Sequence, residues 1–180
     1  TDNTKKELQY ASLAGEQATR IGAYAEAAAH LQRALALVKE VDVPAPAQQE
    51  LSLQLNLGAV MINTRGQASS EAKIAYDRAR ELCQHMETTP QSARATFGLW
   101  AFYLFRGEVG TAHELAQECW RLAQEPRFAE FQLQTHLVMA NTLFWMGRFA
   151  EGLAHFDQVV GLYDASQHHN YIVRYAQNPR

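Results

Sequence analysis

The sequence has little of what marks several large classes of protein. Only two of its 180 residues are cysteine, Cys83 and Cys119, and no metal-binding or redox spacing relates them. Two packed thiols suit a reducing compartment better than a disulfide framework does. No apolar run reaches the roughly 18 residues that a membrane-spanning helix needs. We therefore expect a cytoplasmic protein that makes no membrane contact.

Charge of one sign is not in excess either. Lysine and arginine total 16, aspartate and glutamate total 19, and the net charge is −3. A nucleic-acid-binding surface usually carries a basic stripe, so we expect no nucleic-acid partner. The chain starts at Thr1 rather than at methionine, and we expect it to be a fragment of a longer protein.

Motifs of catalysis are also missing. The glycines do not cluster into a phosphate-binding loop, and no Gly-x-Ser-x-Gly nucleophile motif occurs. Two carboxylate pairs at a spacing of four, Glu114 with Glu118 and Asp77 with Glu81, fit a solvated helix face better than a catalytic dyad. We predict that this chain is not an enzyme and that it uses no cofactor.

The histidines give no metal site. His30 and His155 each lie eight residues after a glycine, and this equivalence indicates surface positions of a scaffold. His168 and His169 are adjacent, so on a helix they would point about 100° apart and chelate poorly. We predict no bound metal.

Helix-breaking residues, in contrast, recur at regular intervals. Four glycines are spaced 44, 41 and 40 residues apart: Gly22, Gly66, Gly107 and Gly147. Prolines lie between them, and the intervening segments show helical apolar spacing with few strand signals. A near-constant period of this length predicts a solenoid of helix pairs.

Aligning the chain on these glycines sharpens the pattern. Small or apolar residues follow a glycine at offsets of 5, 9, 12 and 15, which puts them on one helix face. These residues include Ala27, Leu31, Ala34 and Leu37, then Ala112, Ala116, Cys119 and Leu122, then Gly152, Phe156, Val159 and Leu162. After Gly66 the same register holds with one extra residue.

We therefore predict an all-α chain with eight helices in four antiparallel pairs over residues 1–164. The pairs span 4–41, 47–86, 91–124 and 127–163, and their helices span 4–21 and 24–41, 47–65 and 69–86, 91–106 and 108–124, and 127–146 and 148–163. Residues 165–180 are predicted to start a fifth repeat or to form a C-terminal cap.

Two stretches resemble the second half of a tetratricopeptide repeat (TPR): Gly22-Ala-Tyr24-Ala-Glu26-Ala27 and Gly147-Arg-Phe149-Ala-Glu151-Gly152. Gly15 stands where the repeat consensus has its close-packing glycine. The resemblance implies a right-handed superhelical solenoid. The period of 40–44 residues is longer than the standard repeat and is similar to the long-helix variants of large bacterial regulators.

A narrower resemblance covers almost the whole chain. Its residues are Leu13-Ala-Gly15-Glu16-Gln-Ala18, Ala79-Arg-Glu-Leu82-Cys83, Gly98-Leu99-Trp100 with Phe102 to Glu108, and Gly161-Leu-Tyr163-Asp164 followed by Gln167-His168. They resemble the C-terminal repeat region of bacterial multidomain adenylate/guanylate cyclase–ATPase regulatory proteins. No cyclase or ATPase residues lie in this chain, so those activities would belong to other domains of the parent protein.

The TPR resemblance also implies a concave groove, lined by the first helix of each pair at 13, 10, 6, 3 and 2 residues before each glycine. In the first two units these positions are mainly polar and include Gln9, Ser12, Glu16, Leu53, Asn56 and Asn63. In the last two units they are largely apolar and include Phe97, Leu104, Phe105, Asn141, Phe144 and Trp145. No lysine occurs among the groove positions, which disfavours clamping of a terminal carboxylate.

Two functions fit this groove. The leading hypothesis is a protein-interaction scaffold, the regulatory part of a larger bacterial signalling protein, in which Asn56 and Asn63 hold an extended peptide by hydrogen bonds. The alternative is a small-molecule sensor with its ligand in the aromatic half of the groove. Five aromatic residues between Phe97 and Phe105 are consistent either with a groove or with a helix buried on several faces.

Overall fold

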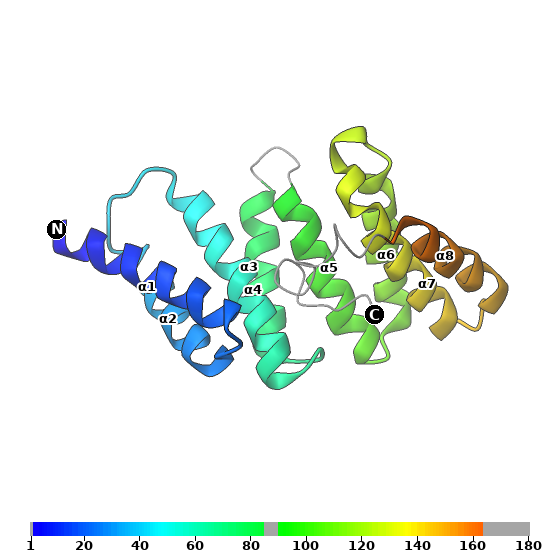
Figure 1. Cartoon of the computed structure of the whole chain (residues 1–180), viewed down its shortest axis with the longest axis horizontal. Helices are drawn as coiled ribbons and strands as arrows, with labels where there is room; N and C mark the ends of the chain where they lie inside the picture. The colour runs from blue at the N-terminus through cyan, green and yellow to red at the C-terminus, as the bar shows by residue number, and fades with distance from the viewer. Residues whose placement is uncertain (1, 85–89, 164–180) are drawn as a thin grey trace.

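In the computed structural model, the described residues are 2–84 and 90–163, and they fold into α-helices with one short 3-10 helix and no strand (Figure 1). The eight α-helices of this part are α1 (Asp2–Arg20), α2 (Tyr24–Leu37), α3 (Pro46–Arg65), α4 (Ser70–Cys83), α5 (Pro90–Phe105), α6 (Val109–Ala123), α7 (Gln132–Trp145) and α8 (Phe149–Leu162). The 3-10 helix η1 (Pro126–Phe131) precedes α7. The predicted fifth repeat or cap at 165–180 lies outside the described residues.

Helices that are adjacent in the sequence pack side by side in one row from α1 to α8 (Figure 1). The first helices of neighbouring pairs also touch, α1 with α3, α3 with α5 and α5 with α7. This is a helical repeat-like all-α architecture, and the prediction of an all-α chain is confirmed for the described part. None of the helices in that part combines enough length with enough apolar character to cross a membrane.

The turn glycines explain why each pair folds back on itself. Gly22, Gly66, Gly107 and Gly147 all have a positive φ, between 76° and 91°, where a side chain would be strained. At Gly22 the next residue, Ala23, donates its backbone N–H to the carbonyl of Ala18, which closes the helix end in a Schellman motif. The same bond recurs after Gly107 and after Gly147.

The turn at Gly66 differs because it is one residue longer. There the Ser69 hydroxyl accepts a hydrogen bond from the backbone N–H of Ala72, at 3.0 Å, and caps the start of α4. This extra residue accounts for the shifted register seen in the sequence after Gly66.

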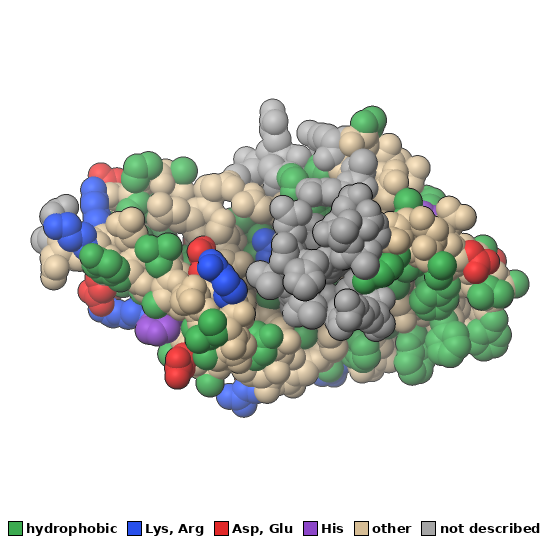
Figure 2. Space-filling view, in the orientation of Figure 1, with side chains coloured by type: hydrophobic (Ala, Val, Ile, Leu, Met, Phe, Trp, Pro, Cys, Tyr) green, Lys and Arg blue, Asp and Glu red, His purple; other side chains and the backbone are tan. Residues whose placement is uncertain are grey.

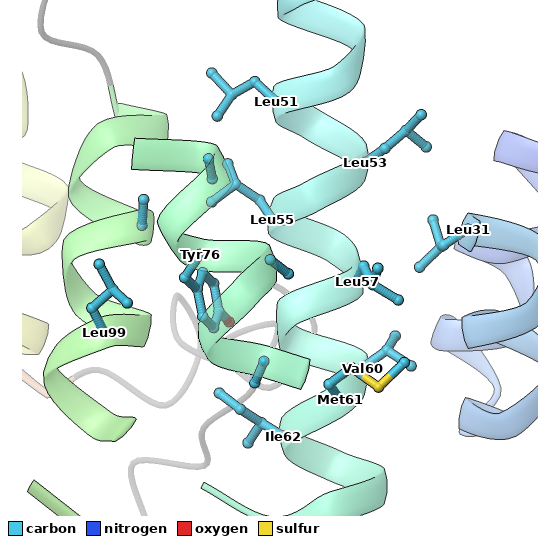
Figure 3. Close-up of a cluster of buried hydrophobic side chains, with 14 of the residues drawn as sticks. Leu31, Leu51, Leu53, Leu55, Leu57, Val60, Met61, Ile62, Tyr76 and Leu99 are labelled. Carbon is cyan, nitrogen blue, oxygen red and sulfur yellow. The ribbon is translucent and has the colours of Figure 1, made fainter. Parts of the chain in front are cut away.

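Glycines inside the helices allow close packing between neighbours. A Cβ atom on Gly15 would lie 2.9 Å from Cγ of Leu31, so α1 and α2 approach closely there. Tyr76 of α4 fills the space beside Gly58 of α3 and Gly98 of α5, where an added Cβ would lie 2.7 and 2.3 Å from its ring. Figure 3 shows Tyr76 between α3 and the helix that carries Leu99.

Two predicted helix bounds, 41 and 127, differ most from the structure. The second helix ends at Leu37 rather than at 41, because its last turn tightens into i→i+3 bonds such as Glu40 N–H to Leu37 O. The predicted helix 127–146 is divided into η1 and α7. Phe128 has non-helical angles (φ −112°, ψ 18°), and the bend buries Phe128 and Phe131 against Ala93.

Candidate functional site

The groove residues predicted from the sequence do not form one continuous surface. Asn56 is half-buried on α3, and Asn63 is exposed near the end of that helix. Phe105, Phe144 and Trp145 are 57%, 53% and 59% exposed. The predicted polar half lies on α1 and α3, and the predicted aromatic half lies on α5 and α7.

Phe97 and Leu104 were expected in the groove, and the structure corrects this. Their side chains are only 8% and 4% exposed, because α5 is packed against α4 and α6 and also touches α3 and α7. Phe97 packs on the Trp100 ring at a centroid distance of 5.3 Å. The Trp100 Nε1–H donates to Oγ1 of Thr142 on α7 at 2.8 Å. Phe97, Trp100 and Phe102 of α5 are therefore core, whereas Tyr103 is half-buried and Phe105 is exposed.

The cavity beside Phe97 is small. It has a volume of about 10 Å³ and is lined by Phe97, Leu122, Phe128, Phe131 and Cys119, among others. A cavity of this size has room for no more than one water molecule. Burial raises the pKa of the Cys119 thiol to about 12, so this thiol stays protonated and unreactive at neutral pH.

Phe144 and Trp145 lie instead at the turn between α7 and α8. Their rings meet edge to face at 6.1 Å, and Phe144 meets Phe149 of α8 at 5.5 Å. Asn141, one turn earlier, donates its amide N–H to the carbonyl of Leu137 on its own helix. Asn63 does the same with Ala59, so each of these amides already uses one of its donors.

An open cleft of about 560 Å³ lies between α1 and α3. From α1 it is lined by Lys5, Leu8, Gln9, Ser12, Leu13 and Glu16. From α3 and the segment before it, the lining includes Pro44, Gln48, Gln49, Ser52, Leu53 and Asn56. Five of the groove positions expected from the sequence thus come together here, namely Gln9, Ser12, Glu16, Leu53 and Asn56.

The cleft combines an apolar floor with amide walls. Leu8 and Leu53 are 5% and 6% exposed and form the floor. Gln9 and Gln49 are exposed on opposite walls, and each amide carries both a donor and an acceptor. The Ser12 hydroxyl, in contrast, donates to the Leu8 carbonyl at 2.8 Å and so supports its own helix.

Opposite charges mark the two ends of the α1 wall. Lys5 and Glu16 are both exposed, and eleven residues of helix separate them by about 16 Å. An extended chain advances about 3.3 Å per residue, so roughly five residues would span this distance. The cleft therefore offers a cation, a row of amides over leucines, and a carboxylate.

The sequence reasoning missed a second polar cluster, between α7 and α8. Nδ1 of His136 lies 3.0 Å from Nδ1 of His155, and Trp120 of α6 meets both rings edge to face at 5.2 Å. Burial lowers the pKa of both imidazoles, while Glu151 opposes this at His155. His155 is thus half-buried, whereas its repeat position predicted a surface residue. The sequence contained no signal for the contact with His136, because the two residues are 19 positions apart and on different helices.

Within residues 2–84 and 90–163, no group of three or more His, Cys, Asp or Glu side chains is placed to hold a metal ion. Comparison with models of known protein families gave no match. Comparison with curated protein sequences gave none either.

Proposed function

We propose that this chain is a protein-interaction scaffold that binds an extended segment of a partner protein in the α1–α3 cleft. The single observation that carries the proposal is the cleft itself, about 560 Å³ in volume and open to solvent, with charges, amides and leucines along it. Its length corresponds to about five extended residues.

The type of ligand follows from the lining. A peptide in extended conformation presents backbone N–H and C=O groups at regular intervals, and Gln9, Gln49 and Asn56 can pair with both. Leu8 and Leu53 would receive apolar side chains from alternate positions of the peptide. Lys5 and Glu16 would then favour an acidic side chain at one end and a basic one at the other.

The proposed architecture is the right-handed superhelical solenoid of long TPR-like pairs. Its support is the positive φ shared by the four turn glycines and the complete burial of Ala27, Ala72 and Ala112 at matching positions. The role as a non-catalytic regulatory part of a larger bacterial signalling protein rests on the sequence resemblance alone. A cytoplasmic location rests on the two thiols, Cys83 and Cys119.

No observation favours the alternative, a small-molecule sensor. That function needs Phe97, Phe105, Phe144 and Trp145 to enclose a ligand. Phe97 is in the core, and the cavity beside it has only about 10 Å³. The other three side chains are more than half exposed at the ends of α5 and α7.

The proposal is tested by selecting 12-residue peptides from a random phage-displayed library on the whole chain. The affinity of a selected peptide is then measured by fluorescence anisotropy. Ser52→Arg places a long side chain in the cleft and should weaken binding at least tenfold. Ser70→Arg, on the exposed first turn of α4, is the matched control and should leave the affinity unchanged. Equal binding by the two variants, with both folded by circular dichroism, would refute the proposed site.

A further inference from the structure

The outward face of α8 carries an apolar stripe that nothing in the described residues covers. Phe149, Leu153 and Val160 are 62%, 61% and 76% exposed, and Phe156 lies between them, half-buried. Spacings of four and seven residues place all four on one side of the helix. Figure 2 shows hydrophobic side chains gathered at the α7–α8 end of the molecule.

The same positions of α2 and α6 are covered, and Trp120 of α6 meets the rings of His136 and His155 in the next pair. These positions lie 2, 6, 9 and 13 residues after the turn glycine, and none of them is exposed. In α2 they are Tyr24, Ala28, Leu31 and Leu35, and in α6 they are Val109, His113, Ala116 and Trp120. Figure 3 shows Leu31 of α2 pointing toward Leu57 of α3. The α8 stripe therefore continues the established interface between one pair and the next.

The opposite end of the row is different in character. The exposed side chains of α1 are mainly charged or amides, with Tyr10 and Leu13 as the large apolar exceptions. Helical arrays need polar outer faces on their terminal repeats. By this criterion α1 has the composition of a terminal helix and α8 that of an internal one.

The chain itself places apolar residues where a following helix is due. Six or eight residues separate one pair from the next, at 38–45, 84–89 and 124–131. The same interval after Leu162 leads to a helix start at about residues 169–171. The sequence there is Asn170-Tyr171-Ile172-Val173-Arg174-Tyr175, and these residues lie outside the described part.

We propose that the α8 stripe is the docking face for a helix that begins near Asn170 in this chain. Tyr171 and Tyr175, four residues apart, would pack against Leu153 and Phe156 as the apolar side of that helix. Asp157 is exposed beside the stripe, and Arg174 supplies the complementary charge. The docked helix would extend the array by the first half of a fifth pair.

Hydrogen exchange of the whole 180-residue chain tests this. Backbone amides of 171–177 should exchange at least tenfold more slowly than in a free peptide of the same sequence. Leu153→Glu should bring them to the free-peptide rate, since it puts a charge into the stripe. Ile74→Glu replaces an aliphatic residue that is 68% exposed on α4, and this matched control should leave the protection intact.

Free-peptide exchange of 171–177 in the wild-type chain would overturn the proposal. Protection that survives Leu153→Glu would overturn it as well, because the segment would then dock elsewhere. Sedimentation velocity tests whether the stripe is instead occupied by a second copy of the chain. A concentration-dependent dimer that Leu153→Glu abolishes, without protection of 171–177 in the monomer, would assign the stripe to self-association instead.

Discussion

At the residue scale, the packing between pairs depends on positions that carry no side chain. The Tyr76 ring is 5% exposed, and Gly58 and Gly98 leave the room that it occupies between α3 and α5. Because this ring is fully enclosed, burial raises the pKa of its hydroxyl far above the ordinary value. One aromatic side chain thus joins three helices of two different pairs.

This packing predicts that Gly98→Ala destabilises the protein. The new Cβ would lie 2.3 Å from Cε2 of Tyr76, and a buried ring between two helices has little room to move. We expect a loss of about 1–3 kcal/mol in the free energy of unfolding, measured by urea denaturation. Gly110→Ala is the control, because no atom lies within 4 Å of its Cβ position and alanine favours the helix. Equal effects of the two substitutions would contradict the close packing described here.

The groove residues expected from the sequence show how far prediction at the level of single residues reaches. Asn56 lines the α1–α3 cleft, whereas Phe97 and Leu104 are buried. The glycine register predicts which side of a helix a residue occupies. It does not say whether other helices cover that side, and α5 has neighbours on more than one face. The nearly unbroken apolar run of α5 was the available signal for burial.

At the element scale, the turns were the most predictable part of the structure. Each turn glycine identified in the sequence has the positive φ that excludes most other residues. The division of 127–146 into η1 and α7 was not predictable, because it depends on burying Phe128 and Phe131 against residues distant in the sequence. The contact between His136 and His155 depends in the same way on how α7 and α8 pack.

The α7–α8 contact should weaken in mild acid. The two Nδ1 atoms are 3.0 Å apart, so one ring donates a hydrogen bond and the other must accept it as a neutral imidazole. Both folded pKa values lie below the ordinary histidine value of about 6.5. As the pH falls, the two histidines therefore become protonated at a higher pH in the unfolded chain than in the folded chain. The stability that this contact contributes is complete above about pH 6.5 and is lost as the pH falls through the lowered pKa values.

This pH dependence is measured as the urea midpoint between pH 8 and pH 5, with tryptophan fluorescence as the signal. His155→Gln should flatten the decline, because it removes one of the two titrating rings. His30→Gln is a matched control, since His30 is exposed and has the same repeat position. The ion pair with Arg78 lowers the pKa of Glu50, so the stabilisation from this pair is lost only below about pH 4.5. Glu50 therefore affects the pH dependence of stability only under more acidic conditions. An unchanged slope in His155→Gln would contradict this assignment.

At the scale of the whole molecule, the row of helices separates two surfaces of different chemistry. The α1–α3 cleft is open and lined by both polar and apolar side chains, and it lies far along the row from the apolar face of α8 (Figure 1). The cleft has the mixed lining expected for a peptide ligand, and the α8 stripe has the uniform lining expected for a helix. One end of the array is thus suited to recognition and the other to extension of the array.

The sequence predicted the row of pairs because its period depends on local turn chemistry. It also indicated that the first two units carry polar groove positions. It could not predict the cleft itself, because the space between α1 and α3 depends on how helices from two different pairs pack against each other. The positions of Lys5 and Glu16 at the two ends of a cleft follow only from the packing of α1 beside α3, which the sequence does not show.

Exchanging these two charges tests the central claim, partner binding in the α1–α3 cleft, most directly. The double variant Lys5→Glu, Glu16→Lys keeps the composition of the cleft and reverses its polarity. The measurement is the affinity, at low salt, of a peptide selected on the wild-type chain and of a second peptide in which the acidic and basic residues are exchanged. Each exposed charge pair contributes about 0.2–1 kcal/mol, so reversing two pairs should change the affinity about tenfold. We expect the wild-type chain to prefer the first peptide and the double variant to prefer the second, whereas identical preferences of the two chains would contradict binding in this cleft.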